Sequence, residues 1–469
     1  MNTEHSFIHG KRVLVLGLGE SGLSMAQWLS RHGARVRVAD SRATPPGLDE
    51  LRSSTRDAEL RFGAFDDALL EGIDLLALSP GLSTDEPVVR TARVRGVAVC
   101  GDIELFARAL PAEHRPKVIA ITGTNGKTTV TALVGAMCRA AELDCEVAGN
   151  IGPAALTALM AREDARRQPE VWVLELSSFQ LETTDTLAPD VATVLNVTED
   201  HLDRHPAMAE YAEAKSRIFY GGGTQVLNRE DRYSMGMAIP GRRRVTFGLN
   251  AAPDNDDFGL INVSGELCLA QGTTPLLPIR EVRLEGLHNA ANALAALALA
   301  RAIGLPFAPL LETLRTFRGL PHRVERVAEA GGVVFYDDSK GTNVGSTVAA
   351  LDGFSRQLAA QHAKVVLIAG GEGKGQDFKP LLAPVTNAAR AVILIGRDAP
   401  LLREALSDSG VPMIDAHDME EAVSKSIELA ERGDVVLLSP ACASLDMYKN
   451  YKQRGAVFCA AVEKLTHRV

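Results

Sequence analysis

The sequence predicts an α/β fold in which mainly parallel sheets are divided among three domains. Short apolar runs typical of buried strands alternate with longer segments of helical spacing through most of the 469 residues. This alternation is typical of parallel strands joined by helices that cover both faces of a sheet. The runs are too numerous for one doubly wound sheet, and two candidate linkers interrupt them, one polar and bracketed by prolines and one that follows a long alanine-rich helix.

The predicted strands follow one another as runs of valine, leucine, isoleucine and alanine. They are expected at Val13–Leu16, Arg35–Ala39, Leu75–Leu78, Val118–Ile121, Val171–Leu174, Val191–Leu195, Val365–Ala369, Ala391–Ile395 and Val435–Leu438. Linkers are expected at Pro111–Pro116 and Arg318–His322, and an acidic surface loop at Pro253–Gly265. We therefore expect domains at residues 1–115, 116–319 and 320–469.

The composition is that of a soluble globular protein, with 46% hydrophobic and 23% charged residues. A net charge of −9 argues against bulk binding of nucleic acid. The six cysteines form no C-x-x-C pair, which favours reduced thiols over disulfides or a zinc site. Because no run approaches about 18 apolar residues and no apolar leader opens the chain, we expect a cytoplasmic protein without membrane insertion.

The most informative motif is Gly123-Thr-Asn-Gly-Lys-Thr128, which lies between a predicted strand and a predicted helix. Its two glycines let backbone N–H groups converge on phosphate oxygens, and the helix N-terminus adds its dipole. Lys127 can contact the β- and γ-phosphates of ATP, and the Thr128 hydroxyl can bind Mg²⁺. The spacing is shorter than the strict phosphate-loop pattern, since Ile121 occupies the first glycine position, so a tight turn without a ligand stays an alternative.

A second glycine-rich turn, Gly17-Leu-Gly-Glu-Ser-Gly22, follows the first predicted strand and opens a helix. Asp40 ends the next strand, near the spacing from which an acidic side chain reaches a ribose hydroxyl in dinucleotide-binding folds. Taken alone, the turn indicates a nicotinamide-dependent oxidoreductase, although Glu20 places a charge beside the expected pyrophosphate. Close packing of strand and helix without a ligand also fits, as does a nucleoside-diphosphate group.

Groups that can bind a metal follow two later strands. Glu175 comes at the end of a predicted strand, where a carboxylate can hold Mg²⁺. His201 follows the next strand and can bind a second divalent ion or orient a water, although a structural histidine fits equally well. Lys215 lies on a predicted helix, where the residues alone indicate only a solvated lysine.

Three polar clusters follow strands in the last third of the chain. They are Asp338–Asn343, Gly370–Asp377 and Ser439–Asp446, and Arg323 ahead of them suits bidentate contact with a phosphate. Each cluster alone is compatible with the chemistry of a tight turn. Because all three lie at the carboxyl ends of strands in one predicted sheet, together they indicate one rim of a binding site.

Together these motifs resemble those of the Mur ligases of peptidoglycan assembly, and the resemblance extends from Val13 to Arg454. Beside the phosphate loop it rests on four motifs: Glu175-Leu-Ser-Ser-Phe-Gln-Leu-Glu182, Asn196-Val-Thr-Glu-Asp-His201, Asp338-Ser-Lys-Gly-Thr-Asn343 and Ser439-Pro-Ala-Cys-Ala-Ser-Leu-Asp446. These motifs match the glutamate-adding type of the family. The sequence contains no Asp-Asn-Pro-Arg, which counts against the diaminopimelate-adding type.

The resemblance implies three Rossmann-like domains, of which the central one has a P-loop-type ATP-binding fold. In chain order the domains would bind UDP, ATP with Mg²⁺, and glutamate. The enzyme would join D-glutamate to UDP-N-acetylmuramoyl-L-alanine through an acyl phosphate, and we expect it to act as a monomer. The resemblance further implies two Mg²⁺ ions and a Lys215 that is carbamylated by CO₂.

The resemblance also assigns roles to individual residues. The implied catalytic residues are Lys127, His201, Lys215 and Lys340, and the implied metal ligands are Thr128, Glu175, His201 and Lys215 as a carbamate. The implied ATP-binding residues are Gly123, Thr124, Asn125, Gly126, Lys127, Thr128, Thr129, Asn289, Asn292, Arg323, Asp338 and Lys340. The implied UDP-sugar residues are Gly17, Glu20, Ser21, Asp40, Ser41, Arg42, Gly81, Asn150, Ser177, Gln180 and His201. The implied glutamate-binding residues are Thr342, Lys374, Ser444, Leu445 and Tyr451.

Two other classes of protein compete with a ligase. A nicotinamide-dependent oxidoreductase explains the turn at Gly17–Gly22, but it leaves Lys127 and Glu175 unexplained. A nucleotide-binding regulatory module without chemistry explains the phosphate loop but not the polar rim of the third domain. Only the ligase hypothesis uses all three regions.

Overall fold

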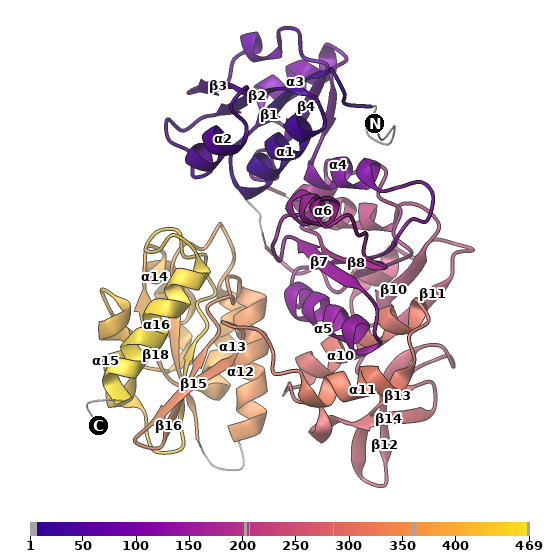
Figure 1. Cartoon of the computed structure of the whole chain (residues 1–469). Coiled ribbons are helices and arrows are strands. Elements are labelled where there is room, and N and C mark those ends of the chain that lie inside the picture. The colour runs from indigo at the N-terminus through magenta and orange to yellow at the C-terminus, as the bar shows by residue number, and fades with distance from the viewer. Residues whose placement is uncertain (1–6, 201–203, 206, 285, 359–362, 467–469) are drawn as a thin grey trace. The chain divides into compact units, whose positions relative to one another are not determined.

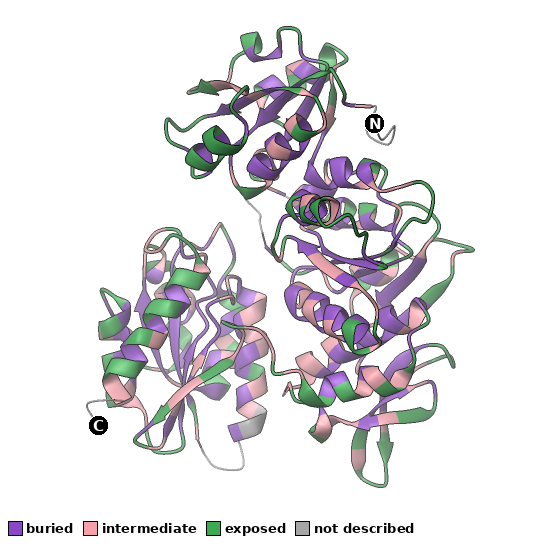
Figure 2. Cartoon of the chain, in the orientation of Figure 1, coloured by how far each residue is buried: buried purple, intermediate pink, exposed green. Residues whose placement is uncertain are grey.

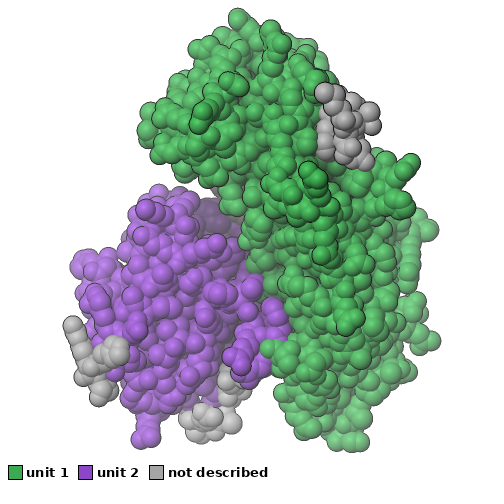
Figure 3. All heavy atoms as spheres, viewed as in Figure 1, with its two compact units in different colours: residues 1–197, 209–282, 291–316 green, residues 198–208, 283–290, 317–469 purple. Residues whose placement is uncertain are grey.

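The computed structural model describes residues 7–200, 204–205, 207–284, 286–358 and 363–466 (Figure 1). The chain divides into two compact units (Figure 3). The first unit comprises residues 1–197, 209–282 and 291–316, and the second comprises residues 198–208, 283–290 and 317–469. The first unit contains two β-sheets and the second unit contains one.

The first sheet is parallel throughout and has the strand order β3-β2-β1-β4-β5. Its strands are β1 (Arg12–Leu16), β2 (Arg35–Asp40), β3 (Glu59–Phe62), β4 (Leu75–Leu78) and β5 (Ala98–Cys100), and its helices are α1 (Glu20–Arg31), α2 (Leu48–Ser54), α3 (Pro87–Val94) and α4 (Asp102–Ala109). β1 passes into α1 through a turn so tight that a Cβ on Gly22 would lie 1.9 Å from the Gly17 carbonyl oxygen. Glycine is therefore required at position 22 by packing alone.

The second sheet has the strand order β14-β13-β12-β11-β10-β9-β6-β8-β7 and is parallel from β7 to β12. Its strands are β6 (Lys117–Thr122), β7 (Cys145–Gly149), β8 (Val171–Glu175), β9 (Val191–Val194), β10 (Thr224–Asn228), β11 (Arg244–Phe247), β12 (Phe258–Val263), β13 (Glu266–Gln271) and β14 (Thr274–Pro278). The helices of this part of the chain are α5 (Lys127–Ala140), α6 (Ala155–Asp164), α7 (Ser178–Leu181), α8 (Met208–Ser216), α9 (Arg232–Gly236), α10 (Leu287–Ala302) and α11 (Phe307–Thr316).

The prediction of a surface loop at Pro253–Gly265 is wrong for the second half of that segment. Phe258–Val263 is β12, which pairs antiparallel with β13 and continues the sheet. The strand begins with buried residues and ends with the exposed Asn262 and Val263, so its own sequence lacks a continuous apolar run. Pairing with the neighbouring strand, which the sequence of the segment does not reveal, stabilises it.

The third sheet has the strand order β15-β16-β20-β17-β18-β19, and only the β15–β16 pair is antiparallel. Its strands are β15 (Glu325–Ala330), β16 (Val333–Asp337), β17 (Val365–Gly370), β18 (Ala389–Ile395), β19 (Met413–Asp415) and β20 (Val435–Leu438). Its helices are α12 (Val344–Leu358), α13 (Leu382–Ala388), α14 (Ala399–Ala405), α15 (Met419–Leu429) and α16 (Tyr451–Thr466).

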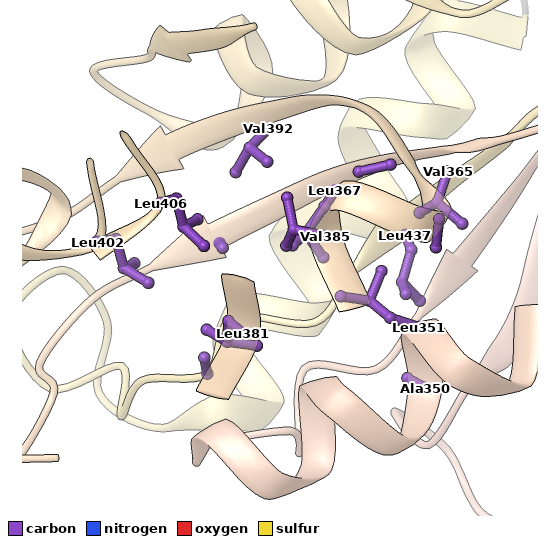
Figure 4. Packing of buried hydrophobic residues seen from close by; sticks show 14 of the residues in the cluster. Ala350, Leu351, Val365, Leu367, Leu381, Val385, Val392, Leu402, Leu406 and Leu437 are labelled. Atoms are coloured by element: carbon purple, nitrogen blue, oxygen red, sulfur yellow. The ribbon is translucent and has the colours of Figure 1, made fainter. Parts of the chain in front are cut away.

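Both faces of the third sheet are buried, because successive residues of each central strand enter different cores. Val365 and Leu367 of β17 lie in one hydrophobic cluster, whereas Val366 and Ile368 lie in another. The first cluster collects side chains from α12, α13, α14 and three strands, among them Leu437 of β20 (Figure 4). Burial on both faces is the physical reason why β17 and β20 have no polar residue between their ends.

The mainly parallel α/β fold predicted from the sequence is confirmed. Each of the nine predicted apolar runs forms a strand, and the bounds differ from the prediction by at most two residues at either end. These strands form the buried interior of each sheet, while the exposed residues lie mainly on helices and loops (Figure 2). Among the described residues, no helix combines the length and the apolar composition that crossing a membrane requires.

Candidate active site

The predicted phosphate loop lies between β6 and the first turn of α5. Gly123 and Gly126 have φ angles of 150° and 81°, which side-chain-bearing residues rarely adopt. The Lys127 Nζ donates hydrogen bonds to the carbonyl oxygens of Gly123 and Thr124, each at 2.8 Å. Thr128 and Thr129, both buried, complete the first turn of the helix. The loop thus presents backbone N–H groups, a cation and a hydroxyl at a helix N-terminus, which is a suitable site for a triphosphate.

Asn196 stabilises the phosphate loop through hydrogen bonds. Its role was not predicted from the sequence. The backbone N–H of Asn125 donates to the Asn196 Oδ1 at 2.8 Å, and the backbone N–H of Thr124 donates to the Asn196 carbonyl oxygen at 2.9 Å. The Asn196 Nδ2 donates in turn to the Asn125 carbonyl oxygen at 3.1 Å. On another side of the loop, the Oδ1 of Asn292 would lie 2.5 Å from a Cβ built on Gly126. Asn292 therefore lies against the loop, a position that is compatible with its predicted role in binding ATP.

Glu175 lies next to the base of the phosphate loop, because β8 pairs with β6 and Glu175 is in register with Ile121. Its side chain is fully buried, and its Oε1 accepts a hydrogen bond from the Asn150 Nδ2 at 2.7 Å. The Glu175 Oε2 has no hydrogen-bond partner among the described residues. A buried carboxylate oxygen without a donor is costly unless a cation compensates it, so Glu175 fits the predicted Mg²⁺ ligand.

The expectation of a solvated lysine at position 215, drawn from the residues alone, is wrong. Lys215 is 1% exposed, and its Nζ donates to the Gly123 carbonyl oxygen at 3.0 Å. The same nitrogen lies 4.3 Å from the ring centroid of Tyr211, one turn earlier on α8. Lys215 is buried because α8 packs this face against the phosphate loop. The other residue predicted as a second metal ligand, His201, lies outside the described residues.

Asp40 organises the loop that follows β2. Its carboxylate accepts hydrogen bonds from the backbone N–H groups of Leu18 at 2.7 Å and Arg42 at 2.9 Å. The guanidinium of Arg42 donates to both carboxylate oxygens, at 2.8 and 2.7 Å. Burial alone would raise the pKa of Asp40, but these hydrogen bonds outweigh it and lower the pKa to about 2. Asp40 therefore connects the turn at Gly17 to the exposed Ser41 and Arg42, which brings these predicted UDP-sugar residues together.

Two further predicted UDP-sugar residues are joined by an aspartate. Ser21 Oγ and Gln180 Nε2 both donate to the Oδ2 of Asp102, at 3.1 and 2.9 Å. Ser177 forms a capping box with Gln180 at the start of α7. Asp102 carries no recognisable signal in the sequence, since a lone carboxylate at a helix start indicates no particular function. Gly81 lies in the exposed loop after β4, and Glu20 is the first residue of α1.

In the second unit, the three polar clusters lie at one edge of the third sheet, as predicted. They follow β16, β17 and β20, which are neighbouring parallel strands. The loops contact one another directly: the Ser439 Oγ donates to the Asp338 Oδ2 at 2.7 Å, and Glu372 and Ala443 exchange backbone hydrogen bonds at 2.8 and 3.0 Å. The buried Arg454, which has no assigned role from the sequence, donates to the Ser339 and Cys442 carbonyl oxygens.

Charged groups are concentrated on this rim. The Lys374 Nζ lies 3.1 Å from the Asp200 Oδ1, and the Asn343 Nδ2 donates to the Asp200 Oδ2 at 3.0 Å. The Lys340 Nζ lies 4.1 Å from the ring centroid of Tyr451. Burial raises the pKa of Asp338 to about 7, although the hydrogen bond from Ser439 and the charge of Arg323 oppose the shift.

The remaining predicted residues divide between the two units. Of the glutamate-binding set, Ser444 is buried, Thr342 and Tyr451 are partly buried and Leu445 is exposed. Asn289 and Arg323 belong to the second unit together with these residues, whereas Asn292 belongs to the first. The structure therefore brings together the phosphate-loop set in the first unit and the glutamate set in the second.

These features define an ATP-binding enzyme of several α/β domains. Three family models match the chain: the MurD-like N-terminal domain of Mur ligases at residues 11–101, the Mur ligase middle domain at residues 121–300 and the Mur ligase glutamate ligase domain at residues 322–442. The chain belongs to the Mur ligase family.

Curated relatives in this family are similar along their whole length. The UDP-N-acetylmuramoylalanine--D-glutamate ligase of Nitrosomonas europaea is 55% identical, over 98% of this chain and 97% of the relative. The enzyme of the same name from Burkholderia mallei is 53% identical, over 97% of each chain.

Solved structures share the fold at much lower identity. The UDP-N-acetylmuramate-alanine ligase of Thermotoga maritima has a TM-score of 0.61 and 21% identity, and the alignment covers 97% of this chain and all of that one (100%). MurF of Acinetobacter baumannii has a TM-score of 0.60 and 16% identity, with coverage of 98% and 93%. These similarities support the fold and carry no assignment of substrate.

Proposed function

We propose that the chain adds D-glutamate to UDP-N-acetylmuramoyl-L-alanine at the expense of ATP, in the cytoplasmic synthesis of peptidoglycan precursors. The observation that carries the proposal is the buried Glu175, which pairs in register with the strand that leads into the phosphate loop and has one oxygen without a hydrogen-bond partner among the described residues. Such an arrangement suits phosphoryl transfer from a metal-bound nucleotide. The relatives of 53–55% identity carry the name of this reaction, which supports the choice of substrates.

The proposed reaction has two steps. A carboxylate oxygen of the UDP-sugar substrate attacks the γ-phosphorus of ATP in line, the bond to the β–γ bridging oxygen breaks, and an acyl phosphate and ADP result. The glutamate amine then attacks the acyl carbon, phosphate leaves, and the amine gives up a proton as the amide forms. Lys127 stabilises the charge on the transferring phosphoryl group, and Lys340, Arg323 and Asp338 also contact the nucleotide.

The site fits Mg²⁺ through Thr128 and Glu175, and the ion would neutralise phosphate charge when bound. We also propose a second ion at His201 and a carbamate on Lys215. The burial of Lys215 beside the Gly123 carbonyl supports that assignment, since a carbamate would replace a cation by an anion that can bind a metal. Lys215→Ala should then lose activity and regain part of it with added short carboxylates. An alanine variant as active as the wild type would remove the carbamate from the proposal.

The UDP end of the substrate is assigned to the β1–α1 turn, Asp40 and Gln180, and the glutamate to Thr342, Lys374 and Ser444. The domains are proposed to end near residues 115 and 319, and the enzyme to act as a monomer. Closure of the domains over the substrates would protect the acyl phosphate from hydrolysis by water.

The test of this function is phosphate release from ATP by the full-length protein. UDP-N-acetylmuramoyl-L-alanine is supplied with either D- or L-glutamate, and NAD(P)H absorbance is recorded in parallel. The proposal expects release that depends on both the UDP-sugar and D-glutamate. Turnover of NAD(P)H instead would support the oxidoreductase, and ATP binding without turnover would support a regulatory module.

A further inference from the structure

A buried carboxylate at the first residue of α4 connects two elements of the first unit. Asp102 is fully buried, and its Oδ2 accepts one hydrogen bond from Ser21 Oγ and another from Gln180 Nε2. Ser21 lies in the first turn of α1, beside the first sheet, whereas Gln180 lies on α7, which follows β8 of the second sheet. One oxygen atom therefore binds side chains from two helices, one that follows a strand of the first sheet and one that follows a strand of the second.

The orientation of Gln180 is set from its other end. Its Oε1 accepts a hydrogen bond from the backbone N–H of Ser177 at 3.1 Å, and the Ser177 Oγ accepts from the backbone N–H of Gln180 at 3.2 Å. This capping box fixes which end of the amide is the donor. The Gln180 Nε2 must then face Asp102, and it would lose its partner if the carboxylate were removed.

Nearby Glu104 shows what a purely structural carboxylate in this region looks like. It is fully buried, and both of its oxygens are bound: by the backbone N–H groups of Asp185 and Thr186 at 2.7 and 2.8 Å, the Thr186 hydroxyl at 2.9 Å and Arg108 at 2.7 Å. Burial would raise the pKa of Glu104, but these hydrogen bonds outweigh it and lower the pKa.

Asp102 is not stabilised in the same way. Its Oδ1 has no hydrogen-bond partner in the described part of the chain, and burial raises the pKa of its carboxyl. A buried carboxylate with one unpaired oxygen lowers the stability of the fold, so stability alone does not explain it. What distinguishes it from Glu104 is the identity of its partners, both of which belong to the proposed UDP-sugar site.

We infer that Asp102 is a positioning residue that holds Ser21 and Gln180 at the separation that the UDP-sugar requires. The inference rests on the proposed function, since that function makes Ser21 and Gln180 ligand-binding groups. Without Asp102 both side chains can rotate away, and the ligand must order them when it binds. Loss of Asp102 should therefore raise the KM for the UDP-sugar and leave the KM for ATP nearly unchanged, because within the described chain the Asp102 carboxylate accepts its side-chain hydrogen bonds from Ser21 and Gln180.

The first test compares Asp102→Ala, Asp102→Asn and Glu104→Gln in the full-length enzyme. Asp102→Ala should raise the KM for UDP-N-acetylmuramoyl-L-alanine by about tenfold or more, and the KM for ATP by less than about twofold, as expected for a lost hydrogen bond to a charged group. Asp102→Asn keeps an acceptor oxygen and should recover most of the loss. Glu104→Gln, the matched control, should lower Tm without changing the ratio of the two KM values.

A donor–acceptor exchange keeps the inference testable if Asp102→Ala fails to fold. Gln180→Glu replaces the donor by an acceptor and should raise the KM for the UDP-sugar. Adding Asp102→Asn to that variant restores one donor and one acceptor, and it should recover at least about half of the loss on a logarithmic scale.

Equal changes in both KM values, the same UDP-sugar defect in Glu104→Gln, or no recovery in the exchanged pair would overturn the inference while leaving the proposed function in place. A wild type that releases no phosphate with this substrate would overturn the proposed function, and the inference with it.

Discussion

The Lys127 amine lies over the phosphate loop. Two loop carbonyl oxygens accept hydrogen bonds from it at 2.8 Å, so the positive charge lies at the loop that is proposed to bind the triphosphate. Neutral carbonyl groups are weaker partners for an ammonium than phosphate oxygens, and ATP can therefore take over the amine at small cost. Preorganisation of this kind lowers the barrier of phosphoryl transfer, because the charge need not be moved during the reaction.

Replacing Lys127 by alanine should lower ATP-dependent turnover by on the order of 10²-fold or more, since a charge that stabilises the transition state is lost. The measurement is phosphate release at saturating substrates. Lys117→Ala is the matched control, because Lys117 starts the same strand and its Nζ donates to the Ile303 carbonyl oxygen at 3.0 Å, away from the loop. Near-normal turnover in Lys127→Ala would contradict the assignment of the loop.

Lys374 already binds a carboxylate within its own unit, that of Asp200 at 3.1 Å. An amine that pairs with an aspartate can pair with a substrate carboxylate by the same charge-assisted bond, worth roughly 1.5–3 kcal/mol. Lys374→Ala should therefore raise the KM for glutamate about tenfold or more and leave the KM for ATP unchanged. The exposed Lys379, at the start of the short 3-10 helix Lys379–Leu381 that follows this loop, provides a control. Equal use of glutamine and glutamate by the wild type would count against this pocket.

Single residues are also where the sequence is least informative. Lys127 and Glu175 could be proposed as site residues because each lies at the carboxyl end of a buried strand, and such ends converge at one edge of a parallel sheet. The environment of Lys215 could not be assigned, because α8 has no clear apolar face that shows which side packs inward. Asn196 and Asp102 act through contacts with residues far away in the chain, which spacing along the sequence does not reveal.

At the scale of elements, the loop after β2 depends on the ionised form of Asp40. The lowered pKa of this carboxyl means that the folded state favours the carboxylate, by about 2 kcal/mol for a shift from 3.8 to about 2. The stabilisation is fully present above about pH 4, where the unfolded chain is also ionised. It is lost as the pH falls toward 2.

The free energy of unfolding should therefore differ between wild type and Asp40→Asn by about 2 kcal/mol at neutral pH, and the difference should shrink below about pH 4. Denaturant titrations across that pH range measure it. Asp49→Asn, at an exposed position on α2, is the control. A difference that is constant with pH would mean that the carboxylate charge of Asp40 does not stabilise the loop.

The strands that could be predicted and those that could not differ in their surroundings. β17 and β20 are buried on both faces, so a run of apolar residues identifies them. β12 to β14 lie toward one end of the second sheet, and exposed residues interrupt their apolar pattern. Such strands are stabilised by pairing with their neighbours, and pairing is a property of two segments at once.

At the scale of the whole molecule, two compact units with separate cores need not unfold together. The sequence contains two tryptophans, Trp28 and Trp172, and both are buried in the first unit. Tryptophan fluorescence therefore reports on the first unit only, whereas circular dichroism reports on both. The second unit can be followed as the difference between the two signals.

Leu437→Ala removes a fully buried side chain from the second unit and should destabilise that unit by about 2–5 kcal/mol. The circular dichroism transition should shift or split, while the fluorescence transition stays in place. Leu159→Ala, at a buried position of α6 in the first unit, should shift the fluorescence transition instead. One coincident transition that moves equally in both variants would show that the units unfold as a single body.

The glycine at position 126 has a consequence for inhibitors and for the evolution of resistance to them. Its φ angle is 81°, and a side chain there would meet the Asn292 Oδ1 at 2.5 Å, so any substitution strains the loop and displaces a neighbour. A compound that binds only main-chain atoms of this loop would leave few tolerable escape mutations within the loop, since the atoms it contacts are common to every amino acid. Escape would have to arise at surrounding side chains, and resistance screens should find it there.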